Sequence, residues 1–214
     1  MLLKIYSNIN SKLRSLLKVG SLFSLIAIPV QSPDNFVDLQ YKDIKPNKVE
    51  IGDTIKIDVE NSASPLFYKF DEVKKWNSIS VSGKIDISKK LESEQKDAYF
   101  QIGVIYEGDY RPGWLVRNIL PEWLLTIINL NSKYGLDAVD FHHFSKEKGF
   151  EPKTESIRDI KLNFISVGPV NEEGSFNGDF KLKDKKILGL WLRADGDDHD
   201  GFFTTEVQNL SIHP

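Results

Sequence analysis

The densest group of polar side chains lies near the C-terminus, where the segment Asp195 to Gly201 reads DGDDHDG. Its four carboxylates repel one another, and a hard cation with six to eight oxygen ligands at about 2.3–2.6 Å relieves such repulsion. The glycines fall at other positions than an EF-hand loop requires. One interpretation of this loop is therefore a structural Ca²⁺ held by Asp195 and Asp197, followed by Asp200. The alternative is a solvated hairpin loop, since tight turns select Asp and Gly in any case.

Two of the four histidines stand together in the segment DFHHF, residues 140–144. Neighbouring residues of a strand point to opposite faces, so Asp140 and His142 share a face and His143 lies on the other. Asp140 and His142 have the residue types of a general-base pair in a hydrolase. No serine in a nucleophile elbow and no HExxH motif accompanies them. The alternative is a half-buried strand histidine that is hydrogen-bonded to a neighbour.

Aromatic residues flank the turn EGDYRPG, residues 107–113. The flat apolar faces of sugars stack on Trp and Tyr, while Asp and Arg side chains bond to sugar hydroxyls. This turn therefore predicts a saccharide site whose members are Tyr106, Asp109, Tyr110, Arg111 and Trp114. Two further tryptophans, Trp76 and Trp191, stand in strand-like segments and are expected in the core.

Two other functions remain open. Glycoside hydrolysis needs two carboxylates roughly 5–10 Å apart, and Glu107 and Asp109 are available for it. About a seventh of the chain is acidic, so such a pair has little specificity. The segment Pro121–Tyr134 has apolar residues at helical spacing, with a proline suited to the first turn and Gly135 just past the end. That helix, with Trp123 exposed, could dock a protein partner or act as a lid.

Apolar residues alternate along several short segments, which is the period of a half-buried strand. The clearest sets are Ile55, Ile57 and Val59; Ile79, Val81, Ile85 and Ile87; and Phe100, Ile102, Val104 and Tyr106. Clusters of Gly, Asn and Asp separate these segments. Many short strands with one inserted amphipathic helix and no βαβ alternation predict a mostly β protein, an antiparallel β-sandwich of the jelly-roll type. We expect one such domain over residues 54–214, preceded by an extended arm over residues 33–53.

The N-terminus has the features of an export signal. Residues 1–18 are polar and basic, and the apolar run Val19–Val30 spans about 18 Å as a helix, short of a bilayer core of roughly 30 Å. We therefore assign residues 1–32 to a signal peptide or, if uncleaved, to an N-terminal anchor, which would be the chain's contact with a membrane. The alternative is a helix of the mature fold. The small-residue site at residues 30–32 is followed by Pro33, which disfavours cleavage there.

Charge and cysteine content exclude several classes. Residues 1–32 hold four basic and no acidic side chains, so the rest of the chain has 24 basic against 31 acidic residues and a net charge of −7. A body this acidic does not favour nucleic acid. The 214 residues contain no cysteine, which excludes disulfides, zinc fingers and thiol nucleophiles. Such a protein must be stable outside the cytoplasm without disulfides.

The C-terminal segment KILGLWLRADGDDHDGFFTTEVQNLSI, residues 186–212, resembles the closing strands of secreted bacterial jelly-roll domains. Galactose-binding-like carbohydrate-binding modules and a family of periplasmic β-sandwich proteins share such an ending. The resemblance implies a fold more than a function. Together these features predict an exported bacterial protein, periplasmic or secreted, that binds a carbohydrate or cell-envelope component. The alternatives are an envelope hydrolase acting on a glycoside or ester and a structural or protein-interaction module.

Overall fold

The alternating segments form two β-sheets in a computed structural model that describes residues 28–30, 32–94, 96–147 and 150–214. The first sheet has the order β11-β6-β13-β4-β3, with β1 also paired to β13; its strands are β1 (Ile28–Pro29), β3 (Lys48–Ile51), β4 (Ile55–Glu60), β6 (Ser78–Lys89), β11 (Ser175–Lys181) and β13 (Phe202–His213). The second has the order β2-β5-β12-β7-β8-β10-β9; its strands are β2 (Phe36–Asp38), β5 (Ala63–Lys75), β7 (Ala98–Gly108), β8 (Gly135–Ser145), β9 (Lys153–Ile157), β10 (Ile160–Pro169) and β12 (Lys186–Asp195).

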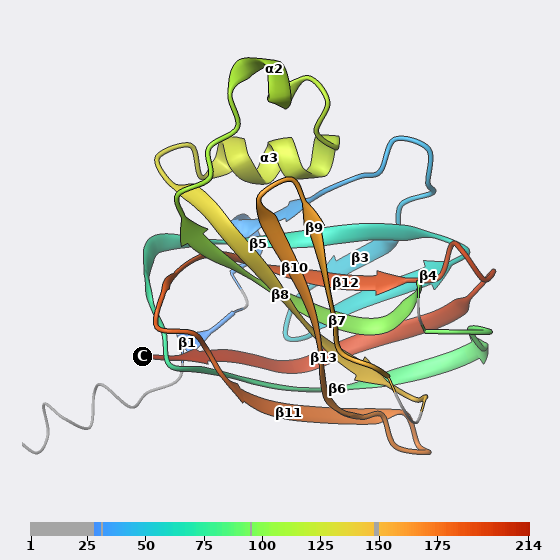
Figure 1. Ribbon diagram of the computed structural model, residues 1–214. Coiled ribbons are helices and arrows are strands. Elements are labelled where there is room, and N and C mark those ends of the chain that lie inside the picture. The colour runs from blue at the N-terminus through green and yellow to red at the C-terminus, as the bar shows by residue number, and fades with distance from the viewer. Residues whose placement is uncertain (1–27, 31, 95, 148–149) are drawn as a thin grey trace, which may run out of the picture.

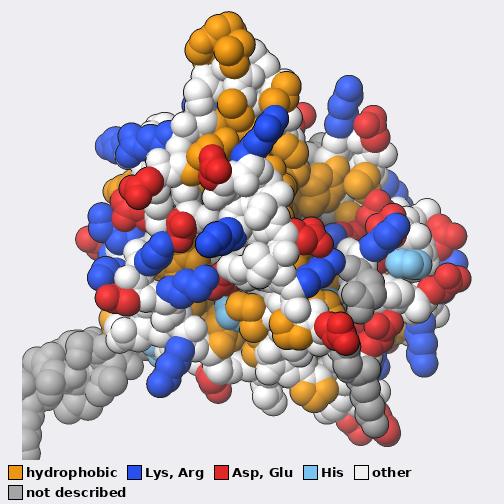
Figure 2. All heavy atoms as spheres, in the orientation of Figure 1, with side chains coloured by type: hydrophobic (Ala, Val, Ile, Leu, Met, Phe, Trp, Pro, Cys, Tyr) orange, Lys and Arg blue, Asp and Glu red, His pale blue; other side chains and the backbone are white. Residues whose placement is uncertain are grey.

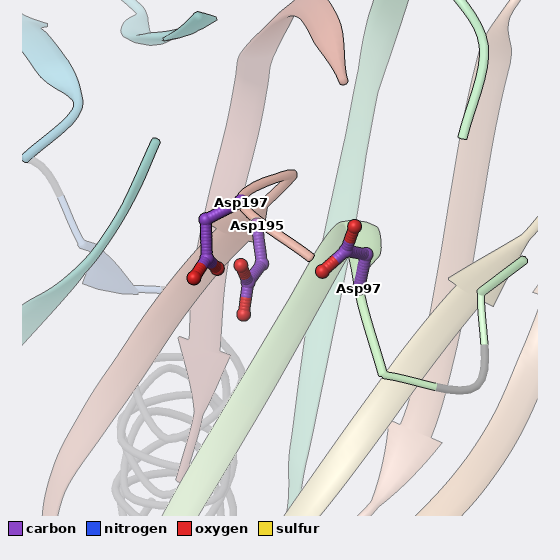
Figure 3. A group of neighbouring side chains, drawn as sticks. All are labelled: Asp97, Asp195 and Asp197. Atoms are coloured by element: carbon purple, nitrogen blue, oxygen red, sulfur yellow. The ribbon is translucent and has the colours of Figure 1, made fainter. Parts of the chain in front are cut away.

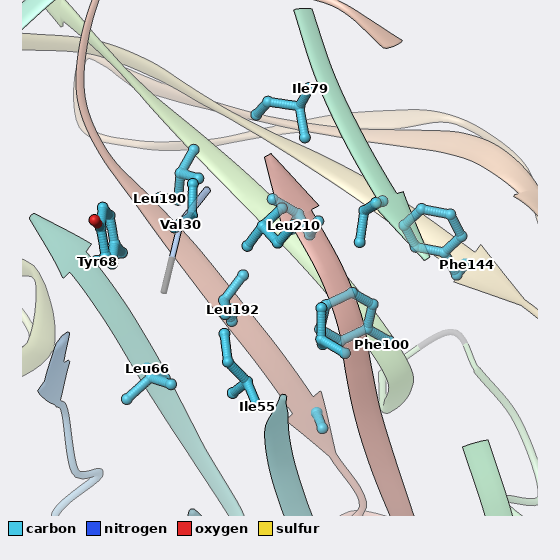
Figure 4. Packing of buried hydrophobic residues seen from close by; sticks show 14 of the residues in the cluster. Val30, Ile55, Leu66, Tyr68, Ile79, Phe100, Phe144, Leu190, Leu192 and Leu210 are labelled. Atoms are coloured by element: carbon cyan, nitrogen blue, oxygen red, sulfur yellow. The ribbon is translucent and has the colours of Figure 1, made fainter. Parts of the chain in front are cut away.

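The two sheets pack face to face around one large apolar core (Figure 1). The alternating residues of β4 enter it from the first sheet, and Leu190 and Leu192 of β12 enter it from the second (Figure 4). Trp76 is also buried there, as the sequence predicts. The predicted mostly β fold with two packed sheets is therefore confirmed.

Helices form a third layer on the outer face of the second sheet (Figure 1). The described residues contain a short 3-10 helix η1 (Pro33–Asn35) and two α-helices, α2 (Trp114–Arg117) and α3 (Glu122–Leu130). Helix α3 buries Leu124 and Ile127 against the sheet, as its apolar spacing predicts. Trp123 packs edge-on against Trp191, with ring centroids 4.6 Å apart. Trp123, which the sequence predicts to be exposed, is therefore half-buried against the protein's own sheet.

The strand pairs are not all antiparallel. β10 runs parallel to β8, while β9 pairs with β10 from the other side in an antiparallel hairpin. The chain thus crosses from the end of β8 to β9 and returns through β10 in the direction of β8. Alternation of apolar residues shows which face of a strand is buried but not the direction of its neighbour, so the sequence could not distinguish this pair.

The segment before residue 54 belongs to the sandwich. β2 pairs with β5 at the edge of the second sheet, and β3 pairs with β4 at the edge of the first. The end of the predicted leader is also part of the fold, because β1 pairs with β13 and Val30 is buried in the core. The Val30 amide donates to the carbonyl of Leu210 at 2.9 Å. The rest of the predicted leader, residues 1–27, lies outside the described residues.

Replacing Val30 with alanine tests whether this segment belongs to the folded protein. We expect Val30→Ala to lower the free energy of unfolding by about 2 kcal/mol, since it removes two buried methyl groups and leaves a cavity. Urea unfolding of the full chain measures the effect. Ser32→Ala, at an exposed side chain with no capping hydrogen bond, is the control and should change stability by less than about 0.5 kcal/mol. Equal stability of the two variants would place Val30 outside the folded core.

Candidate functional site

Three aspartates meet at one end of the second sheet, and we call them the acidic group: Asp97, Asp195 and Asp197 (Figure 3). Asp97 lies just before β7, Asp195 ends the adjacent strand β12, and Asp197 stands in the loop that follows. One carboxylate oxygen from each lies within 4.8 Å of the others. The sequence predicts two of these three residues. Asp97 was missed, because only the pairing of β7 with β12 brings it to the loop.

The third predicted ligand, Asp200, is not in the acidic group. Its side chain is 66% exposed, and its carboxylate lies 3.8 Å from the ammonium of Lys89. The loop is held by backbone hydrogen bonds in which Gly201 donates to the Gly196 carbonyl and Gly196 donates to Ser62. This turn directs Asp197 toward the acidic group and places Asp200 on its outer side.

The acidic group contains two buried carboxylates that are only partly neutralised. Asp97 accepts hydrogen bonds from the ring of His199 and from the Asp198 amide. One oxygen of Asp195 pairs with the Arg193 guanidinium, and the other, Oδ1, has no partner within the described residues. Burial and the Asp195 carboxylate raise the pKa of Asp97, and the same two causes raise the pKa of Asp197 to about 7. The arrangement favours uptake of positive charge, as a proton or as a cation.

A second feature stands at the outer end of the helical layer, where large apolar side chains are exposed. Trp114, Leu115 and Ile119, which we call the apolar tip, are 73%, 63% and 63% exposed. Figure 2 shows hydrophobic side chains gathered at this apex, over α2. Exposed apolar residues grouped in this way mark a contact surface more often than single ones do. The apolar residues of the segment WLVRNIL, residues 114–120, do not alternate as they would in a strand. The sequence thus already sets this segment apart from the sheets.

The residues predicted to bind a saccharide divide between the interior and the tip. Tyr106 is buried between the sheets, where its hydroxyl accepts a hydrogen bond from the Lys183 amide. Tyr110 is half-buried and its backbone bridges to β8, whereas Asp109, Arg111 and Trp114 are exposed. The five residues therefore do not line one concave face. Trp114 keeps an open ring to which a ligand has access.

Asp140 and His142 line a common hollow of about 430 Å³, as their shared strand face predicts. Asp140 is already engaged, because it accepts hydrogen bonds from Lys183 at 2.7 Å and Asn163 at 2.6 Å. The His142 ring stacks on Phe180, and neither of its nitrogens has a partner within the described residues. His142 therefore belongs to neither of the two arrangements considered from the sequence. It is not the partner of a free Asp140 carboxylate, and it is not a strand histidine with a hydrogen bond among the described residues.

In the second candidate pair, Glu107 and Asp109, one of the two carboxylates is already engaged in an ion pair. Glu107 pairs with Lys186 at 3.3 Å, and it is partly buried while Asp109 is exposed. An acid and a base that flank a substrate both need access to it. Neither candidate pair therefore has the arrangement of a working acid and base.

No protein-family model matches the chain, and no curated protein sequence is similar to it. The resemblance to secreted jelly-roll domains thus has only residues 186–212 to support it. Within the described ranges, no helix has the length and apolar character needed to cross a bilayer.

Proposed function

We propose that this chain is an exported, non-catalytic β-sandwich protein that binds a component of the bacterial cell envelope through its apolar tip. The observation that best supports this proposal is the joint exposure of Trp114, Leu115 and Ile119 at the apex of the helical layer. Water contact with three large apolar side chains is unfavourable, by about 1.5–3 kcal/mol for each side chain relative to full burial. A surface that buries them together gains this free energy.

A lipid bilayer with anionic headgroups fits the apolar tip best. The tip projects outward, which suits insertion into a soft surface rather than capture of a ligand in a hollow (Figure 2). Between Asp109 and Glu122 the chain has two arginines, Arg111 and Arg117, and no acidic side chain. Trp lies favourably at the headgroup level, Leu and Ile in the acyl region, and Arg beside phosphates. A saccharide would stack on Trp114 but leave Leu115 and Ile119 in water.

Export and the finer fold are parts of the same proposal. The basic N-terminal segment followed by an apolar run supports export to the periplasm or the exterior. Successive strands change sheets repeatedly, since β4, β6, β11 and β13 lie in one sheet and β5, β7, β10 and β12 in the other, which supports a jelly-roll-like topology. β1 lies in the sheet that the helical layer does not cover (Figure 1). An N-terminal anchor, if it is retained, would therefore emerge on a different side of the protein from the apolar tip.

Vesicle binding tests the proposal. We expect the protein to sediment with vesicles of phosphatidylglycerol and phosphatidylethanolamine, and less with phosphatidylcholine alone. A triple variant with Trp114, Leu115 and Ile119 replaced by serine should bind at least tenfold more weakly, since it loses most of the insertion energy. Phe202→Ser is the matched control, because Phe202 is an exposed apolar side chain on β13.

The outcomes separate the candidate ligands. Weaker vesicle binding by the triple variant, with unchanged binding by Phe202→Ser, supports the lipid surface. Failure of the unmodified protein to bind any vesicle contradicts it. Binding on a glycan array that is lost in Trp114→Ser alone would assign the tip to a saccharide instead. Circular dichroism of each variant checks that the fold is retained.

A further inference from the structure

We propose that the acidic group binds one divalent cation, Ca²⁺, through Asp97, Asp195 and Asp197. The first observation is their convergence, with one oxygen from each within 4.8 Å of the others. The second is the state of Asp195, whose side chain is 3% exposed and whose Oδ1 has no hydrogen-bond partner within the described residues. Figure 3 shows the Asp195 carboxylate directed between the other two. A buried carboxylate oxygen without a donor is costly, and a bound cation satisfies it.

The charge of the site matches one divalent ion. Three ionised aspartates contribute −3, and the Arg193 guanidinium that pairs with Asp195 contributes +1. The ring of His199, counted as neutral, donates to Asp97 and so orients that carboxylate. The remaining charge is −2, and two of the three carboxylates that carry it are buried, where unpaired charge is most unfavourable. One Ca²⁺ neutralises it.

The distances favour Ca²⁺ over Mg²⁺. Oxygen ligands lie at about 2.3–2.6 Å from Ca²⁺, so two ligands on opposite sides of the ion are up to about 5 Å apart. The three oxygens, which lie within 4.8 Å of one another, are thus close to the spacing of ligands around one Ca²⁺. Mg²⁺ holds its ligands at about 2.0–2.1 Å in near-ideal octahedral geometry, so it tolerates less spread among the three oxygens. All of the proposed side-chain ligands are oxygens, the donors that hard cations prefer.

A cation here would link two loops that no covalent cross-link joins. Asp97 belongs to the connection between β6 and β7, and Asp197 to the loop between β12 and β13. The protein has no cysteine, so a disulfide cannot join these loops. Bound Ca²⁺ would hold the ends of β7 and β12 together and make the stability of the sandwich respond to the calcium concentration.

Thermal unfolding and calorimetry of the full chain test the site. After treatment with chelator, we expect added CaCl₂ to raise the Tm of the unmodified protein by several degrees, and MgCl₂ to do so less. Asp97→Asn and Asp197→Asn should each weaken Ca²⁺ binding at least tenfold in isothermal titration. Asp200→Asn is the matched control in the same loop, since Asp200 lies beside Lys89, and it should bind Ca²⁺ as the unmodified protein does.

Asp197→Asn keeps the test independent of folding defects. Because it removes a negative charge from a repulsive group, this variant should be at least as stable as the unmodified protein in chelator, yet gain nothing from Ca²⁺. That combination supports the site. No rise in Tm of the unmodified protein with Ca²⁺ overturns the proposal, as does equal Ca²⁺ affinity in Asp197→Asn and Asp200→Asn. A larger response to Mg²⁺ than to Ca²⁺ overturns the assignment of the ion.

Discussion

Replacing Glu94 with alanine is expected to lower the free energy of unfolding by about 3–5 kcal/mol. Glu94 is 2% exposed, and its carboxylate accepts hydrogen bonds from the Lys146 amide at 2.8 Å and the Glu147 amide at 3.0 Å. Its other oxygen lies 3.2 Å from the ring of His143, which is wholly buried and bonds to Gln101 on its other side. The substitution leaves the Lys146 amide and one ring nitrogen of His143 without a partner, whereas the Glu147 amide keeps its bond to the Ser145 hydroxyl. Groups that lose their partner in the interior are the costly ones.

This network fastens two loops to the second sheet, so its loss should affect the whole domain. Urea unfolding of Glu94→Ala measures the effect, and Glu94→Gln should lose less because its amide oxygen still accepts a hydrogen bond. Glu92→Ala, at an exposed side chain two residues earlier, is the control and should stay within about 0.5 kcal/mol of the unmodified protein. A loss below 1 kcal/mol in Glu94→Ala would mean that water replaces the carboxylate.

The strands of the fold could be predicted because alternation is a local property. The alternating core residues of β4, β6 and β7 were identified from it, whereas Tyr99 and Ile105 of β7, which fall outside that alternation, were not. The edge strands β2 and β3 were not, since three or four residues hold too few alternations to stand out from a polar arm. β1 was hidden for another reason: its residues end an apolar run that also has the pattern of an export signal.

The candidate sites were less predictable, because each joins residues that are distant in sequence. Asp195 and Asp197 stand out in an acidic run, but Asp97 is a lone aspartate until β7 pairs with β12. Glu94 and His143 give no local sign that they meet. The apolar tip was half visible: Trp114 was predicted as a contact residue, whereas Leu115 and Ile119 would be core residues in an ordinary helix. Only the structure, in which α2 projects outward, shows that these residues are exposed rather than part of the core.

The second large effect is a loss of stability in acid that depends on His142. Burial against Phe180 lowers the pKa of His142 to about 4, from an ordinary value of 6.5. The neighbouring Asp140 carboxylate raises this pKa and the Lys183 ammonium lowers it, and Asp179 and Lys181 line the same hollow. Between pH 6.5 and pH 4 the unfolded chain therefore binds a proton at this histidine that the folded protein does not.

The sign follows from this difference in protonation. A group whose pKa is depressed in the folded protein and which is charged when protonated stabilises the unfolded state as the pH falls. Above about pH 6.5 this histidine therefore causes no loss of stability. As the pH falls from 6.5 to 4, it lowers the free energy of unfolding by about 3 kcal/mol in total. Asp197, whose raised pKa acts with the opposite sign, contributes equally to a His142 variant and to the unmodified protein. The difference between the two proteins therefore isolates the histidine.

His142→Phe is the variant that makes this comparison. Phenylalanine keeps an aromatic ring stacked on Phe180 and removes two buried nitrogens that have no partner among the described residues. We therefore expect stability at pH 7.5 to be at least equal to that of the unmodified protein. Urea unfolding at intervals between pH 7.5 and pH 4.5, in the presence of chelator, should show a shallower decline in the variant. Its advantage should grow by up to about 1.4 kcal/mol for each pH unit below 6.5. Parallel curves for the two proteins over this range would show that the imidazole is hydrated and titrates normally in the folded state.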